Sequence, residues 1–252
     1  MKNALIAAAL VGLTATAALA QDATQREAFL AGTSNDCPGC ALSRANLNYR
    51  DLTGANLEGA DLGKARFHRA VLNKANLRNA NLAGANLNLT DLRFADLSGA
   101  DLTNALLYEA NLSAAVMPNA RLTGAHTQHA TLARADMAGV DWSGADATEA
   151  RLPGARLAGA NLSGMYAPQA DFRKVDLKGA DLSGGIFFEA KFSGADLTGA
   201  RLSDADFRQA RLENSIFVDA DLSASHFEQA WTQGADFTGS IRDGVVGLRI
   251  PK

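Results

Sequence analysis

Large apolar residues recur at nearly every fifth position of this 252-residue chain, from Leu42 to Phe237, in an unbroken register. Leu occupies 25 of these positions and Phe occupies 8, so the pattern is almost purely hydrophobic. We call each such position a centre, and the residue two places before it, most often Ala, the small position. A five-residue period rotates successive centres by about 140° around an α-helix, and it alternates them between the two faces of a strand. Neither a straight helix nor a straight strand can bury this pattern.

A chain that bends after every fifth residue can bury all its centres, because each bend turns the next centre toward one axis. Four bends close a coil of about twenty residues, and coils stack at strand spacing, roughly 4.8 Å. The repeat at 40–239 therefore predicts a solenoid of about ten coils, each held by its neighbours. Gly supports the bends, because it adopts unusual backbone angles cheaply. It stands two places after many centres, at Gly54, Gly59, Gly84, Gly99, Gly124, Gly144, Gly154, Gly159, Gly179, Gly194 and Gly199.

The repeat unit has a recognisable form. Ala45–Tyr49, Ala55–Gly59 and Ala60–Lys64 read Ala-Asn-Leu-Asn-Tyr, Ala-Asn-Leu-Glu-Gly and Ala-Asp-Leu-Gly-Lys. The repeat unit is therefore Ala, then Asp or Asn, then Leu and two variable residues. With this unit, the chain closely resembles the pentapeptide-repeat family over residues 40–239. The resemblance implies an all-β fold, a right-handed four-sided parallel β-helix. Members of this family have widely different roles, so the resemblance predicts the fold and leaves the function open.

Residues 1–20 have the features of a cleavable export signal. Lys2 provides the positive charge at the start, and Ala4–Leu13 forms the apolar core. An Ala-Leu-Ala sequence that ends at Ala20 provides a cleavage site before Gln21. The apolar run is too short for a good membrane span, and no Cys follows it closely. We therefore expect neither stable membrane insertion nor a lipid anchor, but a periplasmic or secreted mature chain that begins near Gln21. The alternative is a buried or disordered N-terminal helix.

Residues 21–39 are expected to cap the first coil, whose core and strand edge would otherwise be exposed. A short helix is predicted, because Thr24 and Glu27 have the spacing of a capping box and a glycine follows. Phe29 and Leu30 supply the apolar edge that would pack over the first coil.

Cys37 and Cys40 are the only cysteines and form a Cys-Pro-Gly-Cys sequence. Cys40 stands at a small position, so its side chain should point inward. In an oxidising compartment the pair would form a disulfide that ties the cap to the first coil; otherwise both are buried thiols. A redox-active pair needs a helix N-terminus that lowers a thiol pKa, and zinc needs two further ligands. The sequence shows neither such a helix N-terminus nor two further zinc ligands near the pair, so we expect Cys37 and Cys40 to have a structural role.

Three consecutive coils carry a small or polar centre on one face, at Thr127, Ala147 and Ala167. Losing Leu at these positions would leave a void that costs several kcal/mol unless something fills it. Trp142 is the centre on the preceding side, and Met165 replaces Ala at a small position. We expect either a core rearranged around Trp142 and Met165 or a dent in the wall.

Outward-facing polar residues gather over the same coils. His126 stacks with Asp146, and Glu109, His129 and Glu149 form a neighbouring column. Two His and several carboxylates on adjacent strands could bind a divalent metal or a polar ligand. The alternative is an ordinary solvated face, because side chains on a flat wall splay apart.

Outward columns mix charges of both signs, which bears on nucleic-acid mimicry. Some cytoplasmic pentapeptide-repeat proteins resemble a DNA duplex in size and acidity and act on DNA gyrase. Mixed signs cancel the acidic field that such a mimic requires, and loss of Lys2 changes the net charge only from −3 to about −4. The alternating columns are Asp101, Arg121 and Asp141; Asp181, Arg201 and Asp221; and Asp136, Arg156 and Asp176.

Residues 240–252 follow the last repeat and contain Val245, Val246, Leu248 and Ile250. They are expected to close the last coil as a cap or tail, with a dimer contact as the alternative. The sequence has no Gly-rich phosphate loop before a helix and no Ser elbow with His and Asp partners. Its paired carboxylates recur with the repeat and are explained as ladder residues, so no enzyme and no cofactor are predicted.

These observations predict a non-enzymatic exported scaffold or spacer that binds an unknown protein partner in the cell envelope. We expect a monomer, or a homodimer through an end cap, and no nucleic-acid partner. The first alternative is a ligand- or metal-binding module that uses His126, His129, Asp146, Glu149 and Glu109. The second alternative, gyrase modulation, requires that residues 1–20 are not an export signal.

Overall fold

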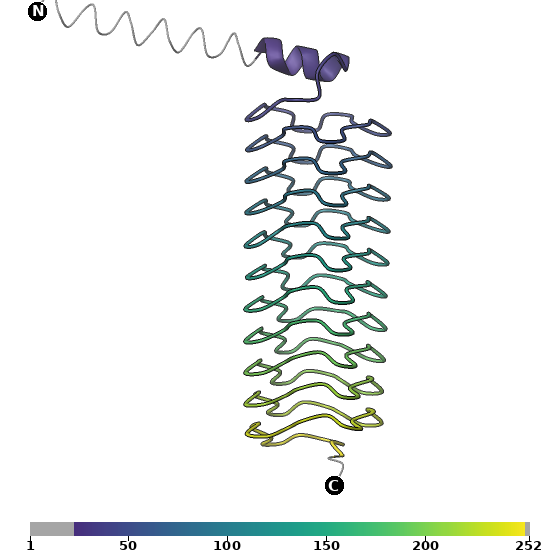
Figure 1. Ribbon diagram of the computed structural model, residues 1–252, viewed down its shortest axis with the longest axis vertical. Coiled ribbons are helices and arrows are strands. Elements are labelled where there is room, and N and C mark those ends of the chain that lie inside the picture. Colours follow the sequence, from purple (N-terminus) through teal and green to yellow (C-terminus); the bar gives the residue numbers. More distant parts are fainter. Residues whose placement is uncertain (1–22, 250–252) are drawn as a thin grey trace, which may run out of the picture.

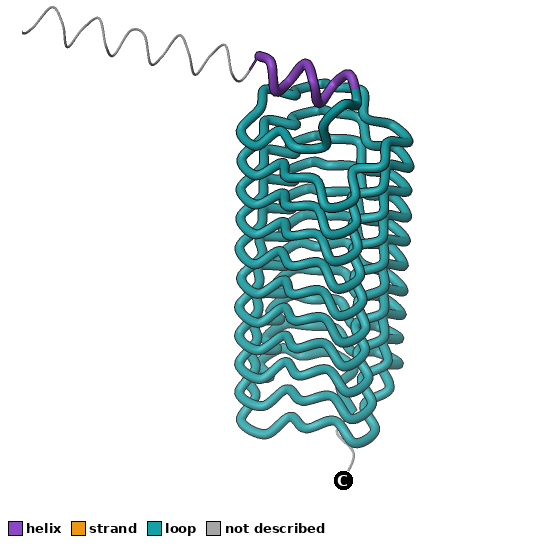
Figure 2. Tube along the Cα trace, turned by 45° about the horizontal axis from the view of Figure 1, so that its top comes forward, coloured by secondary structure: helices purple, strands orange, loops and turns teal. Residues whose placement is uncertain are grey.

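The computed structural model describes residues 23–249 as one helix followed by a coiled rod (Figure 1). The helix spans residues 23–31 and lies across one end of the rod, and the chain leaves at the other end. Figure 2 shows the coils stacked along one axis beneath the helix. The predicted architecture, a solenoid with a short N-terminal helix, is present.

Parallel bridges between residues twenty apart join each coil to the next, from Ala41 with Asp61 to His226 with Val246. Each coil therefore comprises four pentapeptides, one for each side. Within the described residues, these pairings are single bridges and not longer strands, because the chain bends again after each bridge.

Each pentapeptide uses its backbone donors in the same way. Leu62 N donates to Asn81 O in the next coil over 2.7 Å, and Lys64 N donates to Ala83 O over 2.9 Å. Ala65 N donates back to Leu62 O over 2.9 Å and closes a β-turn at the corner. Hydrogen bonds between coils thus alternate with a turn inside each side, so the wall satisfies its own backbone groups.

The second residue after each centre has a left-handed backbone, with φ of 67° at Gly54 and 60° at Leu89 and Phe94. A positive φ at this turn position is the mark of a type II turn. The expected use of Gly at the bends is confirmed, but 24 other residues adopt the same conformation. The coil geometry overrides the preference for Gly, so this corner position can carry almost any side chain outward.

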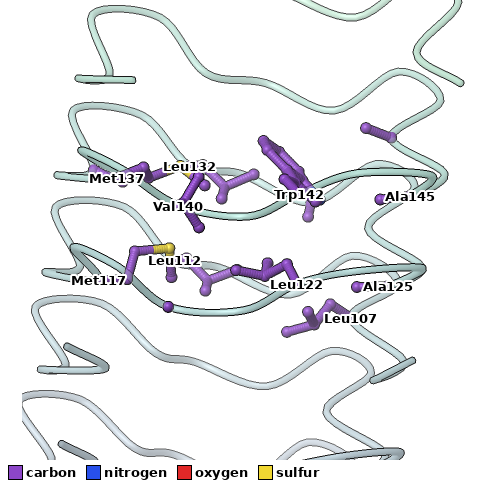
Figure 3. Packing of buried hydrophobic residues seen from close by; sticks show 14 of the residues in the cluster. Leu107, Leu112, Met117, Leu122, Ala125, Leu132, Met137, Val140, Trp142 and Ala145 are labelled. Carbon is purple, nitrogen blue, oxygen red and sulfur yellow. The ribbon is translucent and has the colours of Figure 1, made fainter. Parts of the chain in front are cut away.

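The centres fill the axis of the rod. Every centre before residue 230 is at most 1% exposed, and Figure 3 shows Leu122 and Trp142 pointing inward from successive coils. In the C-terminal half the centres are often aromatic and stack along the axis. Ring centroids lie 5.1 Å apart for Phe187 and Phe207, and 5.3 Å apart for Phe207 and Phe227. Stacking at this spacing adds to the hydrophobic stabilisation between coils.

The N-terminal helix caps the rod through one of the two predicted residues. Phe29 is fully buried, with the Arg50 guanidinium 4.6 Å from its ring centroid and Arg50 Nη1 donating to its carbonyl over 2.7 Å. Leu30 is 42% exposed, so the prediction that it also covers the first coil is wrong. Neighbouring residues of a helix point about 100° apart, and only one can face the coil. Thr24 lies inside the helix, so it is not the residue that begins it.

Cys37 and Cys40 form a disulfide, as predicted, with Cα atoms 5.4 Å apart and both side chains fully buried. Cys37 N donates to Asn56 O over 2.8 Å, and Gly39 N donates to Glu58 O over 2.7 Å. The disulfide therefore closes the turn by which the chain passes from the cap to the first coil.

The coil register continues past residue 239. Bridges include Ile241 and Val246, and Val245 and Leu248 pack against the core. Val246 itself is 43% exposed. The C-terminal segment therefore continues the coil register to Val246, and its expected role as a cap stays a prediction.

Two sequence predictions fall outside the described residues, namely the export signal at 1–20 and the contribution of Ile250. In the described part of the chain, no helix is both long and apolar enough to cross a membrane.

Candidate functional site

The irregular part of the core is completely buried. Thr127, Ala147 and Ala167 have no exposed surface, and Trp142 and Met165 are also fully inside. The two large side chains that were expected to fill the space thus lie in the core. The Trp142 ring extends across the interior one coil away from Leu122 (Figure 3).

Two polar groups enter this part of the core. Thr127 Oγ1 donates to Asp146 O over 3.1 Å, which satisfies its hydroxyl. Trp142 Nε1 is buried without a hydrogen-bond partner. An unsatisfied buried N–H costs about 1–3 kcal/mol, so packing of the indole must outweigh this cost.

The predicted His and carboxylate patch divides into two parts. In the first part, His129 Nδ1 lies 3.5 Å from Glu149 Oε2, and the Tyr108 ring meets the His129 ring edge-on with centroids 5.4 Å apart. A hydrogen bond from Tyr108 to Glu109, together with the charge of that carboxylate, raises the pKa of Tyr108. These four side chains form an exposed polar row.

In the second part, His126 and Asp146 form a bridge pair, but the Asp146 carboxylate is already engaged. It accepts hydrogen bonds from Gln128 Nε2 over 2.7 Å and from the Thr148 backbone nitrogen and hydroxyl over 3.0 and 2.7 Å. Between residues 23 and 249, no group of three or more His, Cys, Asp and Glu side chains is arranged to hold a metal ion. The five predicted residues therefore do not converge on one point.

Most outward carboxylates belong to the wall itself. Asp101 Oδ1 accepts from the Thr103 backbone nitrogen over 2.9 Å and from its hydroxyl over 2.5 Å. Burial raises the pKa of Asp101, but these hydrogen bonds and the Arg121 charge outweigh burial and lower it. This role was not predicted, although Ser or Thr directly after the centre signals it. The same motif recurs at Asp96–Ser98, Asn111–Ser113, Asp141–Ser143, Asp146–Thr148, Asn161–Ser163, Asp181–Ser183, Asp196–Thr198, Asp221–Ser223 and Asp236–Thr238.

The mixed-sign columns form ion pairs between coils. The nitrogen–oxygen distances are 3.8 Å for Arg121–Asp101, 3.3 Å for Arg156–Asp136 and 3.5 Å for Arg201–Asp181. The arginines are exposed, so each pair contributes at most about 1 kcal/mol. Each of these columns has two aspartates for one arginine, so the ion pairs reduce its negative charge without cancelling it.

A groove that the sequence analysis did not identify follows one corner of the rod, parallel to its axis. Its volume is about 770 Å³, and its lining residues are spaced at intervals close to twenty, so they come from consecutive coils. They are Phe94, Ser113, Ala114, Ala133, Arg134, Pro153, Gly154, Arg173, Lys174 and Ser193.

The groove follows from the size of the side chains at this corner. Ala114, Ala133, Pro153 and Gly154 are short, and they lie between Phe94 toward the N-terminal end and a basic pair toward the C-terminal end. The short residues leave space that the flanking long side chains enclose. Small corner residues in consecutive coils were the available signal in the sequence.

Comparisons with known proteins address the fold. A family model described as pentapeptide repeats matches the chain in eight copies, at residues 51–88, 70–107, 85–124, 128–164, 155–189 and 190–229. No sequence among the curated proteins matches the chain.

Several solved structures are similar. HetL, a pentapeptide repeat protein involved in heterocyst differentiation regulation from the cyanobacterium Nostoc sp. strain PCC 7120, is 28% identical over 84% of this chain and 91% of its own, with a TM-score of 0.35. QnrB1, a plasmid-mediated fluoroquinolone resistance protein, is 18% identical over 79% of this chain and 86% of its own, with a TM-score of 0.44. A pentapeptide repeat protein of the Arabidopsis thaliana thylakoid lumen is 28% identical over 48% of this chain and 71% of its own, with a TM-score of 0.31.

Proposed function

The chain belongs to the pentapeptide repeat family, whose members fold as right-handed quadrilateral β-helices, and we propose that it acts as a non-enzymatic scaffold that binds a protein partner in the cell envelope. Pentapeptide repeat proteins are generally structural or interaction modules. Fold alone does not assign a partner, so the proposal rests on the surface of this particular rod.

The observation that carries the proposal is the regularity of the wall. The same bridge and turn pattern repeats from Ala41 to Val246. Its backbone donors and many of its carboxylates form hydrogen bonds within the wall itself. Side chains at the corners project from this wall at fixed spacings, even where they are large, as at Phe94. A rigid surface with preset side-chain positions loses little conformational entropy on binding, which suits a scaffold.

Crosslinking in intact cells tests the scaffold role. Adducts of the tagged chain would be purified under denaturing conditions and identified by mass spectrometry. We expect one dominant partner protein. The chain could instead be recovered without other proteins under conditions that crosslink known envelope complexes. That result would exclude a partner-binding scaffold and favour a purely structural role.

Export is part of the proposal and has a separate test. The expected mature chain begins near Gln21, and its location is periplasmic or secreted. Cell fractionation checks the location, and N-terminal sequencing checks the first residue of the mature chain. A full-length chain in the cytoplasm would contradict export and would revive gyrase modulation, against which the paired charges between coils argue.

A ligand- or metal-binding role has weaker support. His129 meets one carboxylate, that of Glu149, while the Asp146 carboxylate is engaged by its own wall. Titration with zinc, calcium or copper while following the unfolding midpoint tests this role, because a ligand that prefers the folded state raises the midpoint. We expect no shift.

The ends of the rod bear on the oligomeric state. The N-terminal end is covered by Phe29, and Val245 and Leu248 pack against the core at the other end. We propose a monomer, with a homodimer through the C-terminal end as the alternative. Sedimentation equilibrium distinguishes the two states.

A further inference from the structure

We propose that the groove at residues 94–193 is the partner-binding surface and that it takes an extended acidic peptide segment carrying an apolar side chain. The inference rests on the proposed scaffold role and specifies where that role resides. Three features of the groove support it: its direction and length, its lining, and its charge.

The direction of the groove fits an extended chain lying along the rod. The lining runs from Phe94 to Ser193, about five coil spacings, or about 24 Å at roughly 4.8 Å per coil. An extended peptide rises about 3.4 Å per residue, so about seven residues span the groove. Such a peptide crosses the coils at right angles, and recognition must therefore come from side chains and not from strand addition.

The lining provides apolar contacts. Phe94 is 56% exposed at one end of the groove, and Ala114, Ala133 and Pro153 form its floor. The stem of Arg134 also belongs to the wall, because a Cβ placed on Gly154 would lie only 3.9 Å from Arg134 Cγ. An exposed aromatic ring beside a shallow channel is a suitable contact for one apolar side chain of a bound segment.

The charge along the groove is positive. Arg173 is neutralised by Asp171, to which its Nε and Nη2 donate over 2.8 and 2.6 Å. Arg134 and Lys174 also line the groove, and neither has an ion-pair partner within residues 23–249.

A smaller hollow continues the groove and extends the positive strip. It shares Arg173 and Ser193 with the groove and adds Lys191 and Arg211. Arg211 is paired with Glu213 at 2.9 Å, and Lys191 is the bridge partner of Asp171 and lies among the carboxylates of Glu149, Asp171 and Glu189. Attraction of a segment of opposite charge, and its register, therefore depend mainly on Arg134 and Lys174.

Selection from a phage-displayed library of random peptides of about ten residues tests the proposal while the partner is still unidentified, because this length exceeds the groove. Selection is carried out in parallel on the wild-type rod and on the double variant Arg134→Glu/Lys174→Glu. Glu is compatible with this position of the pentapeptide, because Glu109, Glu149 and Glu189 occupy the same position at another corner with φ of 54–56°. We expect peptides enriched on the wild type to be acidic and to contain an aromatic or aliphatic residue.

The affinity of a selected peptide, measured by fluorescence polarisation near physiological salt, separates the groove from general charge attraction. The Arg134→Glu/Lys174→Glu variant should weaken binding about tenfold or more, because each lost charge pair is replaced by repulsion. The matched control Lys64→Glu/Arg69→Glu makes the same charge change at two other corners with φ of 57° and 55° and should leave binding unchanged. Gly154→Arg fills the groove while adding positive charge, and it should also weaken binding.

Several results would overturn the assignment. They are enrichment of basic peptides, enrichment of no peptide on the wild-type rod, equal loss in the two double variants, or full binding by Gly154→Arg. Crosslinking in cells tests the scaffold role separately. If the Arg134→Glu/Lys174→Glu variant still crosslinks to the protein that the wild-type rod captures, the groove assignment fails while the proposed function stands.

Discussion

The carboxylate of Asp141 accepts hydrogen bonds from both the backbone nitrogen and the hydroxyl of Ser143, over 3.3 and 2.7 Å. The residue before a centre thus fixes the turn that follows the centre. Asn161 Nδ2 in the next coil donates to the same oxygen over 3.1 Å, and Thr123 Oγ1 in the previous coil donates to the other oxygen over 3.0 Å. One side chain therefore links three coils.

The first prediction concerns this link. Asp141→Ala removes all four hydrogen bonds and should lower the free energy of unfolding by about 1–3 kcal/mol. Asp141→Asn should cost less than half as much, because Asn keeps the Oδ1 acceptor and serves in this role at Asn111 and Asn161. Urea unfolding measures both. Equal stability of the Ala variant and the wild type would show that the link is dispensable.

The second prediction concerns the small centres. If Trp142 and Met165 fill the space beside Ala147, then Ala147→Leu overpacks the core and should lower the free energy of unfolding by about 1–3 kcal/mol. In Trp142→Leu/Ala147→Leu the same Leu should be better tolerated, with a coupling of at least about 0.5 kcal/mol in the double-mutant cycle. A stabilising effect of Ala147→Leu alone would instead reveal an unfilled dent.

The third prediction concerns the disulfide. Cys37 and Cys40 are separated by only 3 positions, so loop-closure entropy attributes about 2 kcal/mol to the bond. Cys37→Ala/Cys40→Ala should therefore lose at least this much stability, because Ala suits the small position of Cys40 but leaves a smaller side chain at the fully buried position of Cys37.

The location of that loss is also predicted. In a solenoid each coil contacts only its neighbours, so hydrogen exchange should accelerate in the N-terminal helix and the first coils and stay unchanged beyond about the third coil. Faster exchange along the whole rod would show that the rod unfolds as one cooperative unit.

The fourth prediction concerns pH. Burial raises the pKa values of Asp171 and Asp206, but their paired arginines, through hydrogen bonds and charge, lower them below the usual range. A carboxyl whose pKa is lower in the folded state releases its proton more readily there, so it stabilises the fold above its unfolded-state pKa. Thermal midpoints should be flat between about pH 6 and 8 and fall below about pH 4. A midpoint that rises on acidification would contradict these pKa directions.

Much of the fold could be read from the chain, because a five-residue period admits few packings. The twenty-residue register and the buried centres follow from where the small and large residues stand, whereas the disulfide at Cys37 and Cys40 was expected only for an oxidising compartment. The orientation of Leu30 could not be predicted in this way, since it depends on how the helix lies on the first coil.

The candidate site was much less predictable. Column positions placed His126 near Asp146, but they could not show that the Asp146 carboxylate would bond to Gln128 and Thr148 instead. The groove was not predicted because it is formed by short corner residues such as Gly154, and such residues carry no reactive or charged group that marks a site in the sequence.

A photo-crosslinking amino acid placed at single corner positions in cells tests whether the rod works through a protein bound to its wall. Ala114 lies in the groove, and Ala158 is a half-buried corner residue outside it. We predict an adduct with one protein from Ala114 and none, or far less, from Ala158. Absence of a protein adduct from Ala114, with the chain folded and correctly located, would contradict binding in the groove, and absence from every corner position in turn would contradict the scaffold function itself.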